Sequence, residues 1–369
     1  MRFTLAGTIG LLCAVAATAS IEADARRGAA FFETQRCNMC HSVGSVVRSS
    51  GRAGAPDLAS RVDRDYTPAG IASRMWNHAP TMWAAMSKEG IKPPDVTPQQ
   101  AADLFAFFYS ARYFEQPGDA GRGKRIWTEK KCAECHADAV RPKAAGPGIA
   151  QWDSIRDPIS MVAAMWNHIP RMKNEFATKK ISWPQLTSQD LADMMVYLRN
   201  LPEARRAEPS FVVGAGNIDG AQVFQSKGCA DCHKGAMALE NKLGNETLTG
   251  IAVQMWNHGP KMKQSAPITD AEMRSLLATV WANNFFASRG SAARGKSVFE
   301  AKKCGTCHGE GGAPKLDGSQ TSVISMVSAL WKHGPTMSAR LKEKNMTWPQ
   351  FTPGQMSDLV AYLGKPAGK

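Results

Sequence analysis

Apart from its first segment, the 369-residue sequence lacks any run of about 20 uninterrupted apolar residues, so we expect no membrane-spanning helix in the rest of the chain. Cysteine is scarce, with nine residues in a long chain, which excludes a miniprotein held together by disulfides. Lys and Arg give a formal charge of +13, but no basic tail or recognition helix is present, which argues against a nucleic-acid partner. With 43% hydrophobic and 21% charged residues, the chain is expected to fold rather than stay disordered.

The first 25 residues have the pattern of a secretory signal peptide. Arg2 precedes an apolar stretch that begins at Leu5, and Ala-x-Ala cleavage sites end at Ala19 and Ala25. The apolar core is short for a bilayer span, which makes an uncleaved anchor the less favoured alternative. We therefore expect residues 1–25 to be removed and the mature protein to be soluble and periplasmic. Cys13 lies in this segment and is assigned no function.

The other eight cysteines form four copies of one motif, Cys-x-x-Cys-His. The copies end in a His each time: Cys37, Cys40 and His41; Cys132, Cys135 and His136; Cys229, Cys232 and His233; Cys304, Cys307 and His308. In a helical turn, two thiols three residues apart lie on one side of the chain, where each can form a thioether with one haem vinyl group. The adjacent His can then bind the iron. The motifs predict four covalently bound haem c groups.

Three other uses of paired cysteines fit less well. A thioredoxin-type redox pair needs no following His and belongs in a βαβ context. Zinc sites usually combine two such pairs at short separation, whereas these motifs are roughly 75 to 97 residues apart. Structural disulfides would leave the four adjacent histidines without a role.

The similarity between the four regions extends beyond the motif. A Gly followed by an apolar pair precedes each motif and predicts a short first helix: Gly28 with Phe31 and Phe32, Gly123 with Ile126 and Trp127, Gly220 with Val223 and Phe224, and Gly295 with Val298 and Phe299. Second helices are expected to begin at Thr67-Pro68, at Asp157-Pro158, near Thr247 and at Thr321-Ser322. Last helices are expected to begin with the capping boxes Thr97-x-x-Gln100, Thr187-x-x-Asp190, Thr269-x-x-Glu272 and Thr352-x-x-Gln355.

The second helix carries a shared Trp-x-His-x-Pro-x-Met signature. Its four copies are Trp76-Asn77-His78-x-Pro80-x-Met82, Trp166-Asn167-His168-x-Pro170-x-Met172, Trp256-Asn257-His258-x-Pro260-x-Met262 and Trp331-Lys332-His333-x-Pro335-x-Met337. We expect the Pro to end this helix. The residue before the Trp is Met in three copies and Leu330 in the fourth, so this column is expected in the core. The Trp column is expected to pack in the core against haem rather than to relay electrons.

With these helices around a Cys-x-x-Cys-His motif, each region resembles a domain of the class I cytochrome c family. The resemblance implies an all-α fold of four tandem class I cytochrome c-like domains, in which haem supplies a large part of each apolar core. After the signal peptide at 1–25, we expect repeat 1 at residues 26–117, repeat 2 at 118–206, repeat 3 with a preceding linker at 207–290, and repeat 4 at 291–369.

Repeats 1 and 3 resemble each other, and so do repeats 2 and 4. Repeats 2 and 4 carry Trp-Pro before the last helix, at Trp183-Pro184 and Trp348-Pro349, whereas repeats 1 and 3 end in double aromatics. This alternation predicts a duplicated di-haem pair, with residues 201–217 connecting the two pairs. A fragment that begins near residue 214 is then expected to fold and bind two haems.

The motif makes His41, His136, His233 and His308 the proximal iron ligands. For the distal position the resemblance favours Met82, Met172, Met262 and Met337, because the family's ligand Met lies a few residues beyond the middle helix. The alternative is His78, His168, His258 and His333, the histidines outside the motifs. The residue that does not bind iron is expected beside the haem.

Two protein ligands on every iron predict an exported tetra-haem c-type cytochrome that transfers electrons and has no substrate site of its own. One alternative is a haem oxidoreductase, of the peroxidase or sulfur-compound type, with one displaceable ligand. Another is the electron-transfer subunit of a larger oxidoreductase. The basic charge, partly offset by haem propionates, favours redox partner proteins with acidic docking surfaces, and allows peripheral association with a membrane redox complex.

Overall fold

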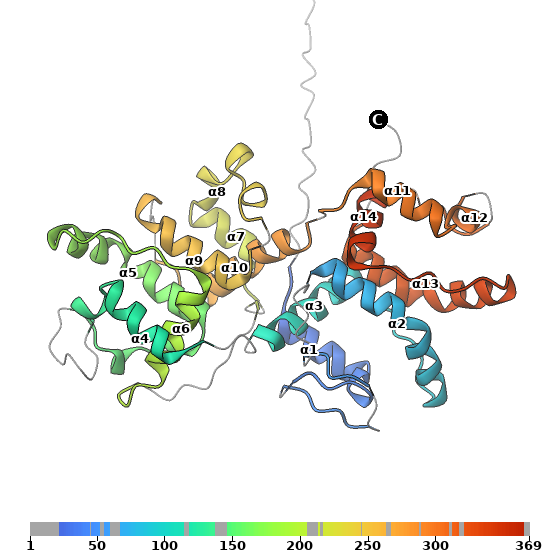
Figure 1. Ribbon diagram of the computed structural model, residues 1–369, viewed down its shortest axis with the longest axis horizontal. Helices are drawn as coiled ribbons and strands as arrows, with labels where there is room; N and C mark the ends of the chain where they lie inside the picture. The colour runs from blue at the N-terminus through green and yellow to red at the C-terminus, as the bar shows by residue number, and fades with distance from the viewer. Residues whose placement is uncertain are drawn as a thin grey trace, which may run out of the picture.

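The computed structural model describes residues 22–44, 46–51, 55–59, 67–113, 118–136, 146–204, 213–214, 217–244, 246–262, 267–287, 289–309, 312–316 and 321–364. These residues form helices and loops, and no β-strand occurs among them (Figure 1). The α-helices are α1 (Ala25–Thr34), α2 (Pro68–Lys88), α3 (Pro98–Tyr113), α4 (Ala120–Glu129), α5 (Pro158–Thr178), α6 (Ser188–Arg199), α7 (Gly220–Ser226), α8 (Cys229–Cys232), α9 (Leu248–His258), α10 (Asp270–Phe285), α11 (Ala292–Ala301), α12 (Gly305–His308), α13 (Val323–Glu343) and α14 (Pro353–Leu363). Short 3-10 helices are η1 (Cys37–Met39), η2 (Cys132–Glu134), η3 (Ile149–Gln151), η4 (Ser154–Arg156), η5 (Gly235–Met237), η6 (Leu239–Asn241) and η7 (Gly259–Lys261). The all-α expectation is confirmed for the described residues.

The helices begin where the sequence places cap residues. Thr67, Asp157 and Thr247 cap the second helices as predicted, while Ser322 rather than Thr321 caps α13. All four last helices have the reciprocal bonds of a capping box, in which the Thr hydroxyl accepts from the backbone N–H three residues on and the side chain there accepts from the Thr N–H. Local sequence therefore sets these helix starts.

The signature Pro does not end the second helix in three of the four repeats, which corrects the expectation. Helices α2, α5 and α13 run on through Pro80, Pro170 and Pro335, whereas α9 ends at His258 and continues only as η7. A helical Pro removes one N–H donor and leaves the carbonyl four residues earlier without its usual partner. The freed carbonyl of Trp76 instead accepts a bond from the Trp348 indole (2.9 Å). An outside donor thus compensates for the Pro.

In each repeat the first and last helices cross at close range: α1 with α3, α4 with α6, α7 with α10, and α11 with α14. A glycine of the first helix lies at every crossing. A Cβ added to Gly28, Gly123, Gly220 or Gly295 would lie 2.1, 2.1, 2.1 or 2.0 Å from a backbone oxygen of the facing helix. Because no Cβ fits there, the recurrent Gly is explained by this approach rather than by flexibility.

Three of the crossings also carry an ion pair between the helices. An Arg next to the crossing Gly meets an Asp of the last helix: Arg27 with Asp103 (2.9 Å), Arg122 with Asp193 (2.7 Å), and Arg294 with Asp358 (2.7 Å). Repeat 3 has Asp219 and Ser275 at these positions and lacks the pair. The hydrogen bond from Arg294 holds the pKa of Asp358 below its ordinary value.

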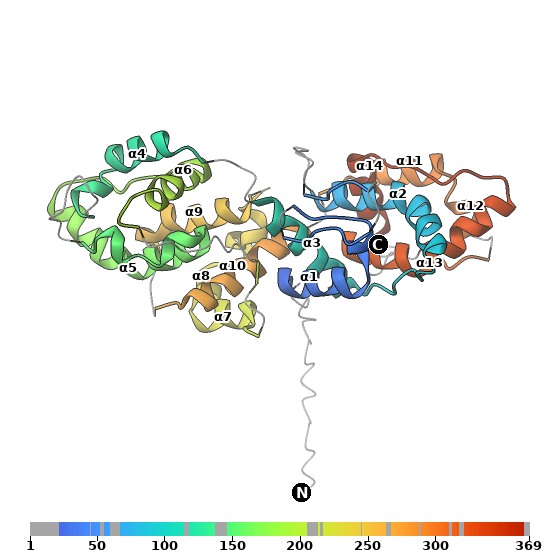
Figure 2. The ribbon, with the colours of Figure 1, turned by 90° about the horizontal axis from the view of Figure 1, so that it is seen from below.

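The repeats associate in space as 1 with 4 and 2 with 3 (Figures 1 and 2). Helix α2 contacts α13 and α14, and α5 contacts α9 and α10. Arg274 of α10 also donates to the buried Asp157 at the start of α5 (2.9 Å). The duplicated-pair hypothesis is therefore wrong about which repeats touch. A fragment that begins near residue 214 would hold repeats 3 and 4, which belong to different pairs.

Repeats 1 and 3 meet at the centre of the molecule through α3 and α10. Tyr109 packs against Trp281 with ring centroids 4.6 Å apart, and its hydroxyl accepts a bond from the Leu248 backbone N–H (2.9 Å). Phe105 and Phe286 lie 5.8 Å apart. The four repeats therefore follow one another in space in the order 4, 1, 3, 2.

Two parts of the sequence interpretation lie wholly or mostly outside the described residues. Cys13 and residues 1–21 of the predicted signal peptide are outside, as are residues 205–212 and 215–216 of the predicted connector. The described residues of the predicted signal peptide, however, have a structural role. Asp24 caps α1, and its backbone N–H donates to Asp103 (2.8 Å), so the folded repeat 1 begins before residue 26.

Candidate haem sites

Each Cys-x-x-Cys-His motif forms one tight helical turn. The residue before the first Cys is left-handed in all four copies: Arg36 (φ 61), Lys131 (φ 64), Gly228 (φ 76) and Lys303 (φ 57). The backbone N–H of the motif His then donates to the carbonyl of the first Cys at 3.0 Å in every copy. This turn places both cysteines and the His on one side of the chain, as thioether attachment and iron binding require.

The motif histidines are oriented by a hydrogen bond that the sequence analysis missed. The Nδ1 atoms of His41, His136 and His308 lie 3.0, 3.2 and 2.9 Å from the carbonyl oxygens of Pro56, Pro147 and Pro314. In repeat 3 the Met237 carbonyl takes this place at 3.4 Å from His233. A carbonyl partner requires Nδ1 to carry the proton, which leaves Nε2 free to bind a metal. A Pro in the loop after each of these three motifs is the sequence signal.

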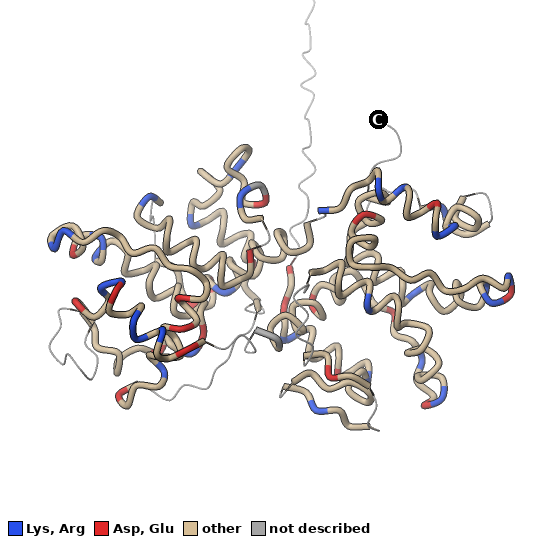
Figure 3. Tube along the Cα trace, in the orientation of Figure 1, with Lys and Arg blue, Asp and Glu red and all other residues tan. Residues whose placement is uncertain are grey.

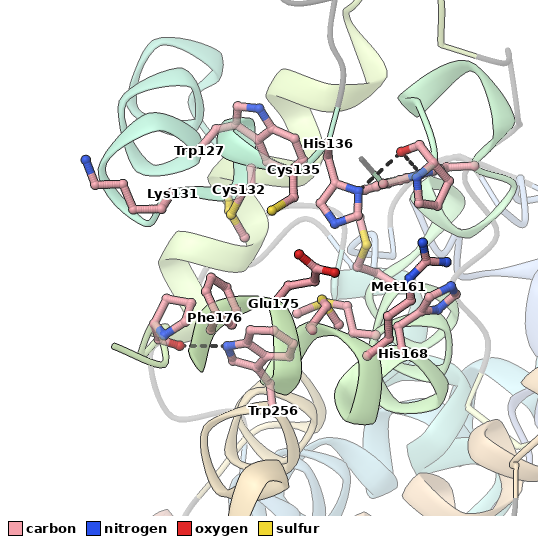
Figure 4. Close-up of a pocket in the computed structure, with 18 of the residues that line it drawn as sticks. Trp127, Lys131, Cys132, Cys135, His136, Met161, His168, Glu175, Phe176 and Trp256 are labelled. Carbon is pink, nitrogen blue, oxygen red and sulfur yellow. Dashed lines mark hydrogen bonds between the residues drawn. The ribbon is translucent and has the colours of Figure 1, made fainter. Parts of the chain in front are cut away.

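Repeat 2 contains a partly open, largely apolar cavity between its motif and α5. About 970 Å³ of space, partly open to solvent, is lined by Cys132, Cys135 and His136 of the motif and by His168 and Met172 of α5 (Figure 4). Most other lining side chains are apolar, among them Trp127, Trp152 and Met194. The predicted anchors, proximal ligand and both distal candidates of this repeat therefore border one site.

The fit of haem can be tested on the histidines of repeat 1. The rings of His41 and His78 lie in an edge-to-face arrangement, with centroids 6.5 Å apart and an interplanar angle of 72°. A metal–nitrogen bond of about 2 Å, with the ring centre about 1.2 Å behind the nitrogen, places two imidazoles on one metal roughly 6.4 Å apart. The observed spacing matches that value, so the distance between the two rings fits a metal ion held by both.

The distal candidates lie on one helix, one turn apart. His78 and Met82 belong to α2, and His168 and Met172 belong to α5, because these helices continue through Pro80 and Pro170. Met82 packs in the apolar cluster around Trp83 and Leu330. Loss of hydration, with repulsion from His41 added, lowers the pKa of His78 and favours its neutral, iron-binding form. In both repeats the Met therefore lies within the second helix and not beyond its end, which corrects the placement that the resemblance implied.

The first Cys of each motif has a thiol pKa raised by burial, which is unlike a redox-active pair. Burial raises the pKa of Cys37 to about 11 and that of Cys132 to about 12, opposite to the activated thiols of thioredoxin-type pairs. No group of three or more His, Cys, Asp or Glu side chains in the described residues is arranged to hold a metal ion by itself. The raised thiol pKa values agree with the assignment of the motifs to haem.

The signature Trp and Asn serve the contact between repeats, a role that the sequence analysis did not assign. The indoles of Trp76 and Trp256 donate to the carbonyls of Pro349 and Pro184, both at 2.8 Å. Each Asn side chain bonds both backbone polar groups of one partner residue: Asn77 with Phe351, Asn167 with Ile268, and Asn257 with Leu186. The Trp-Pro sequences of repeats 2 and 4 are the receiving surfaces.

Comparison with known families agrees with this geometry. Residues 120–202 and 292–365 match the family model of cytochrome c. Each cytochrome c match begins at the first residue of the first helix of a crossing pair, α4 or α11, and ends shortly after the second helix, α6 or α14. The matches support a haem-based electron-transfer protein, because members of the cytochrome c family bind haem covalently. Neither the curated proteins nor the solved structures contain a match to the chain.

The surface of the described residues carries mixed charge. Lys and Arg are spread over both halves of the molecule, often beside Asp and Glu, as at the free ends of α5 and α13 (Figure 3).

No described helix is both long and apolar enough to cross a membrane.

Proposed function

We propose that the chain is an exported tetra-haem c-type cytochrome, with one haem in each repeat, that transfers electrons between redox partners. The pair His41 and His78 carries the proposal, because a centroid spacing of 6.5 Å would let both side chains hold one haem iron. Bound haem supplies a one-electron iron couple. With two protein ligands on the iron, the side chains would hold, bury and tune that couple rather than bind a substrate.

We propose histidine as the distal ligand in all four repeats. His78 supports this directly, and His168 supports it through its own hydrogen bond. Its Nδ1 lies 2.7 Å from the Ala164 carbonyl, which leaves Nε2 free, and its proximity adds to the burial that lowers the pKa of His136. His258 and His333 follow from the repeat. The methionine assignment stays a prediction, and Met172 lies close enough to His168 to be its neighbour at the haem.

Export is part of the proposal, with cleavage at the earlier of the two candidate sites. Asp24 is 2% exposed and caps α1, and the Ala25 N–H donates to the Val213 carbonyl (3.0 Å). Cleavage after Ala25 would remove that cap, whereas cleavage after Ala19 keeps it. Mass spectrometry of the exported protein should give a mature N-terminus before Asp24.

The function is tested by ligand binding and optical spectroscopy on the exported holoprotein. A pyridine haemochrome assay should give four haems per chain, and the dithionite-reduced native protein should bind no carbon monoxide within seconds. Rapid binding of one equivalent of carbon monoxide would refute the electron carrier and favour the oxidoreductase alternative. A near-infrared sulfur-to-iron band in the oxidised protein would refute histidine ligation in the haems that produce it.

Acidic redox partners remain the proposed class of partner. The formal charge of +13 is spread over the chain, and two propionates per haem offset part of it locally. The rate of electron exchange with an acidic partner should therefore fall as ionic strength rises. A rate that does not depend on salt would exclude electrostatic docking.

A further inference from the structure

One wall of the cavity in repeat 2 comes from repeat 3. Trp256 of α9 lines that cavity together with Pro184 and Leu186, although its own motif cysteines and His233 lie in another site. Its position is fixed on three sides. The indole donates to the Pro184 carbonyl (2.8 Å), the ring packs on Trp183 at 4.2 Å between centroids, and the next residue, Asn257, bonds both backbone groups of Leu186.

The same arrangement recurs between repeats 4 and 1. Trp76 of repeat 1 donates to Pro349 (2.8 Å) and packs on Trp348 at 5.0 Å, and Asn77 bonds both backbone groups of Phe351. These are the residues of repeat 4 that correspond to Pro184, Trp183 and Leu186 of repeat 2.

Side chains of repeats 4 and 2 also contact residues of repeats 1 and 3. The Trp331 indole of repeat 4 lies 3.2 Å from the Met75 sulfur of repeat 1. Met75 corresponds to Met165, which lines the cavity of repeat 2. Asn167 of repeat 2 holds Ile268 of repeat 3 through the same double bond that Asn257 makes to Leu186. Each member of a pair thus reaches toward its partner's site.

We infer that neighbouring haem sites share a wall: Trp256 of repeat 3 closes the haem site of repeat 2, and Trp76 of repeat 1 closes the haem site of repeat 4. The four sites therefore act as two joined pairs, repeat 2 with repeat 3 and repeat 4 with repeat 1. The inference rests on the proposed haem function. Trp256 is two residues from His258 on the same short helix, so one side chain borders the first site and the other belongs to the second.

This arrangement gives electrons an order that differs from the order of the motifs in the sequence. With haem bound in both sites, one electron would pass from the reduced iron on one side of the wall to the oxidised iron on the other. The indole stays in its ground state as a packed medium, and no bond or proton changes. Because the aromatic contact between Tyr109 and Trp281 joins repeats 1 and 3, the route runs 4, 1, 3, 2, with repeats 2 and 4 at the ends.

The test asks which haem responds when Trp256 is changed in the full-length holoprotein. Two marker variants identify the haems through the resolved methyl resonances of the oxidised protein. Trp152→Leu marks repeat 2, because Trp152 lines that cavity and its ring lies 5.0 Å from His136. Phe224→Leu marks repeat 3, because its ring lies 6.4 Å from His233. Trp256→Leu is then compared with both, and Trp256→Phe serves if the Leu variant fails to fold.

The expected result is that Trp256→Leu displaces the same methyl resonances as Trp152→Leu and leaves the Phe224 set in place. In a redox titration, one of the four steps should move to lower potential, because water admitted to the site stabilises the oxidised iron. Displacement of the Phe224 set alone, or of all four sets equally, would overturn the shared wall. These assignments do not depend on carbon monoxide binding, so failure of the electron-carrier proposal is recognised separately.

Discussion

The hydrogen bond from the Trp348 indole to the Trp76 carbonyl should contribute more to stability with Pro at position 80 than with a residue that has a backbone N–H. Pro80 cannot donate to that carbonyl, and the indole of the partner repeat lies 2.9 Å from it. Trp348→Phe keeps the aromatic packing on Trp76, at 5.0 Å between centroids, and removes only the donor. Pro80→Ala restores a backbone N–H at position 80. The two substitutions should therefore couple.

The size of the effect follows from the partial burial of the bond. Leaving a buried acceptor without a partner costs about 1 to 3 kcal/mol, and Trp348 is only half-buried, so we expect about 1.4 kcal/mol for Trp348→Phe. With Ala at position 80, the N–H there bonds the carbonyl, and the same substitution should cost about 0.4 kcal/mol. The coupling is then about 1 kcal/mol.

Native-state hydrogen exchange of the holoprotein measures this coupling locally, in the peptides of one helix, and does not require the whole chain to unfold in two states. Peptides from α2 should exchange about tenfold faster in Trp348→Phe, and about twofold faster when Pro80→Ala is also present. Trp183→Phe is the matched control, because its indole makes the equivalent bond to the Trp256 carbonyl (3.2 Å) and should affect α9 instead. Equal acceleration by Trp348→Phe in both backgrounds would refute the role assigned to Pro80.

Three further substitutions test other parts of the fold. Gly123→Ala should lower the free energy of unfolding by at least about 3 kcal/mol, because the added Cβ would lie 2.1 Å from a backbone oxygen. Gly121→Ala is the control and should be tolerated, because the nearest atom to its Cβ lies at 3.3 Å. Equal losses of stability in the two variants would contradict the helix-crossing argument. Lys131→Gly should stabilise the protein by about 1 kcal/mol, because φ is 64°, and a loss of thermal stability would show that no strain is relieved there. The hydrogen bond from Arg294 is the main cause that lowers the pKa of Asp358 from its ordinary value of 3.8. The ionised Asp358 therefore stabilises the folded protein at pH values above 3.8, and this contribution is lost as the pH falls through the pKa of the folded state. Arg294→Gln should flatten the acid limb of a plot of melting temperature against pH, and parallel plots would exclude the ion pair as a source of stability.

Local features were predictable because their cause lies within a few residues of sequence. The capping boxes and the Cys-x-x-Cys-His turns each depend on groups three or four positions apart, and the sequence located all of them among the described residues. The recurrent Gly was visible as a pattern, although its reason, the approach of a second helix, was not. The Pro expectation failed for α2, α5 and α13, because a helix passes through Pro when tertiary contacts support the helix on both sides of it.

The sequence by itself determined the four motifs, their repeats, the all-α class and the two distal candidates of each site. Only the tertiary structure decided that repeat 1 joins repeat 4 and repeat 2 joins repeat 3, that the histidines of repeat 1 lie edge to face, and that Trp256 borders a neighbour's site. The physical reason is that the receiving surfaces, Trp183-Pro184 and Trp348-Pro349, are chemically the same. Either could hold the Trp and Asn of repeat 1 or repeat 3, and only the position of the helices in space selects one.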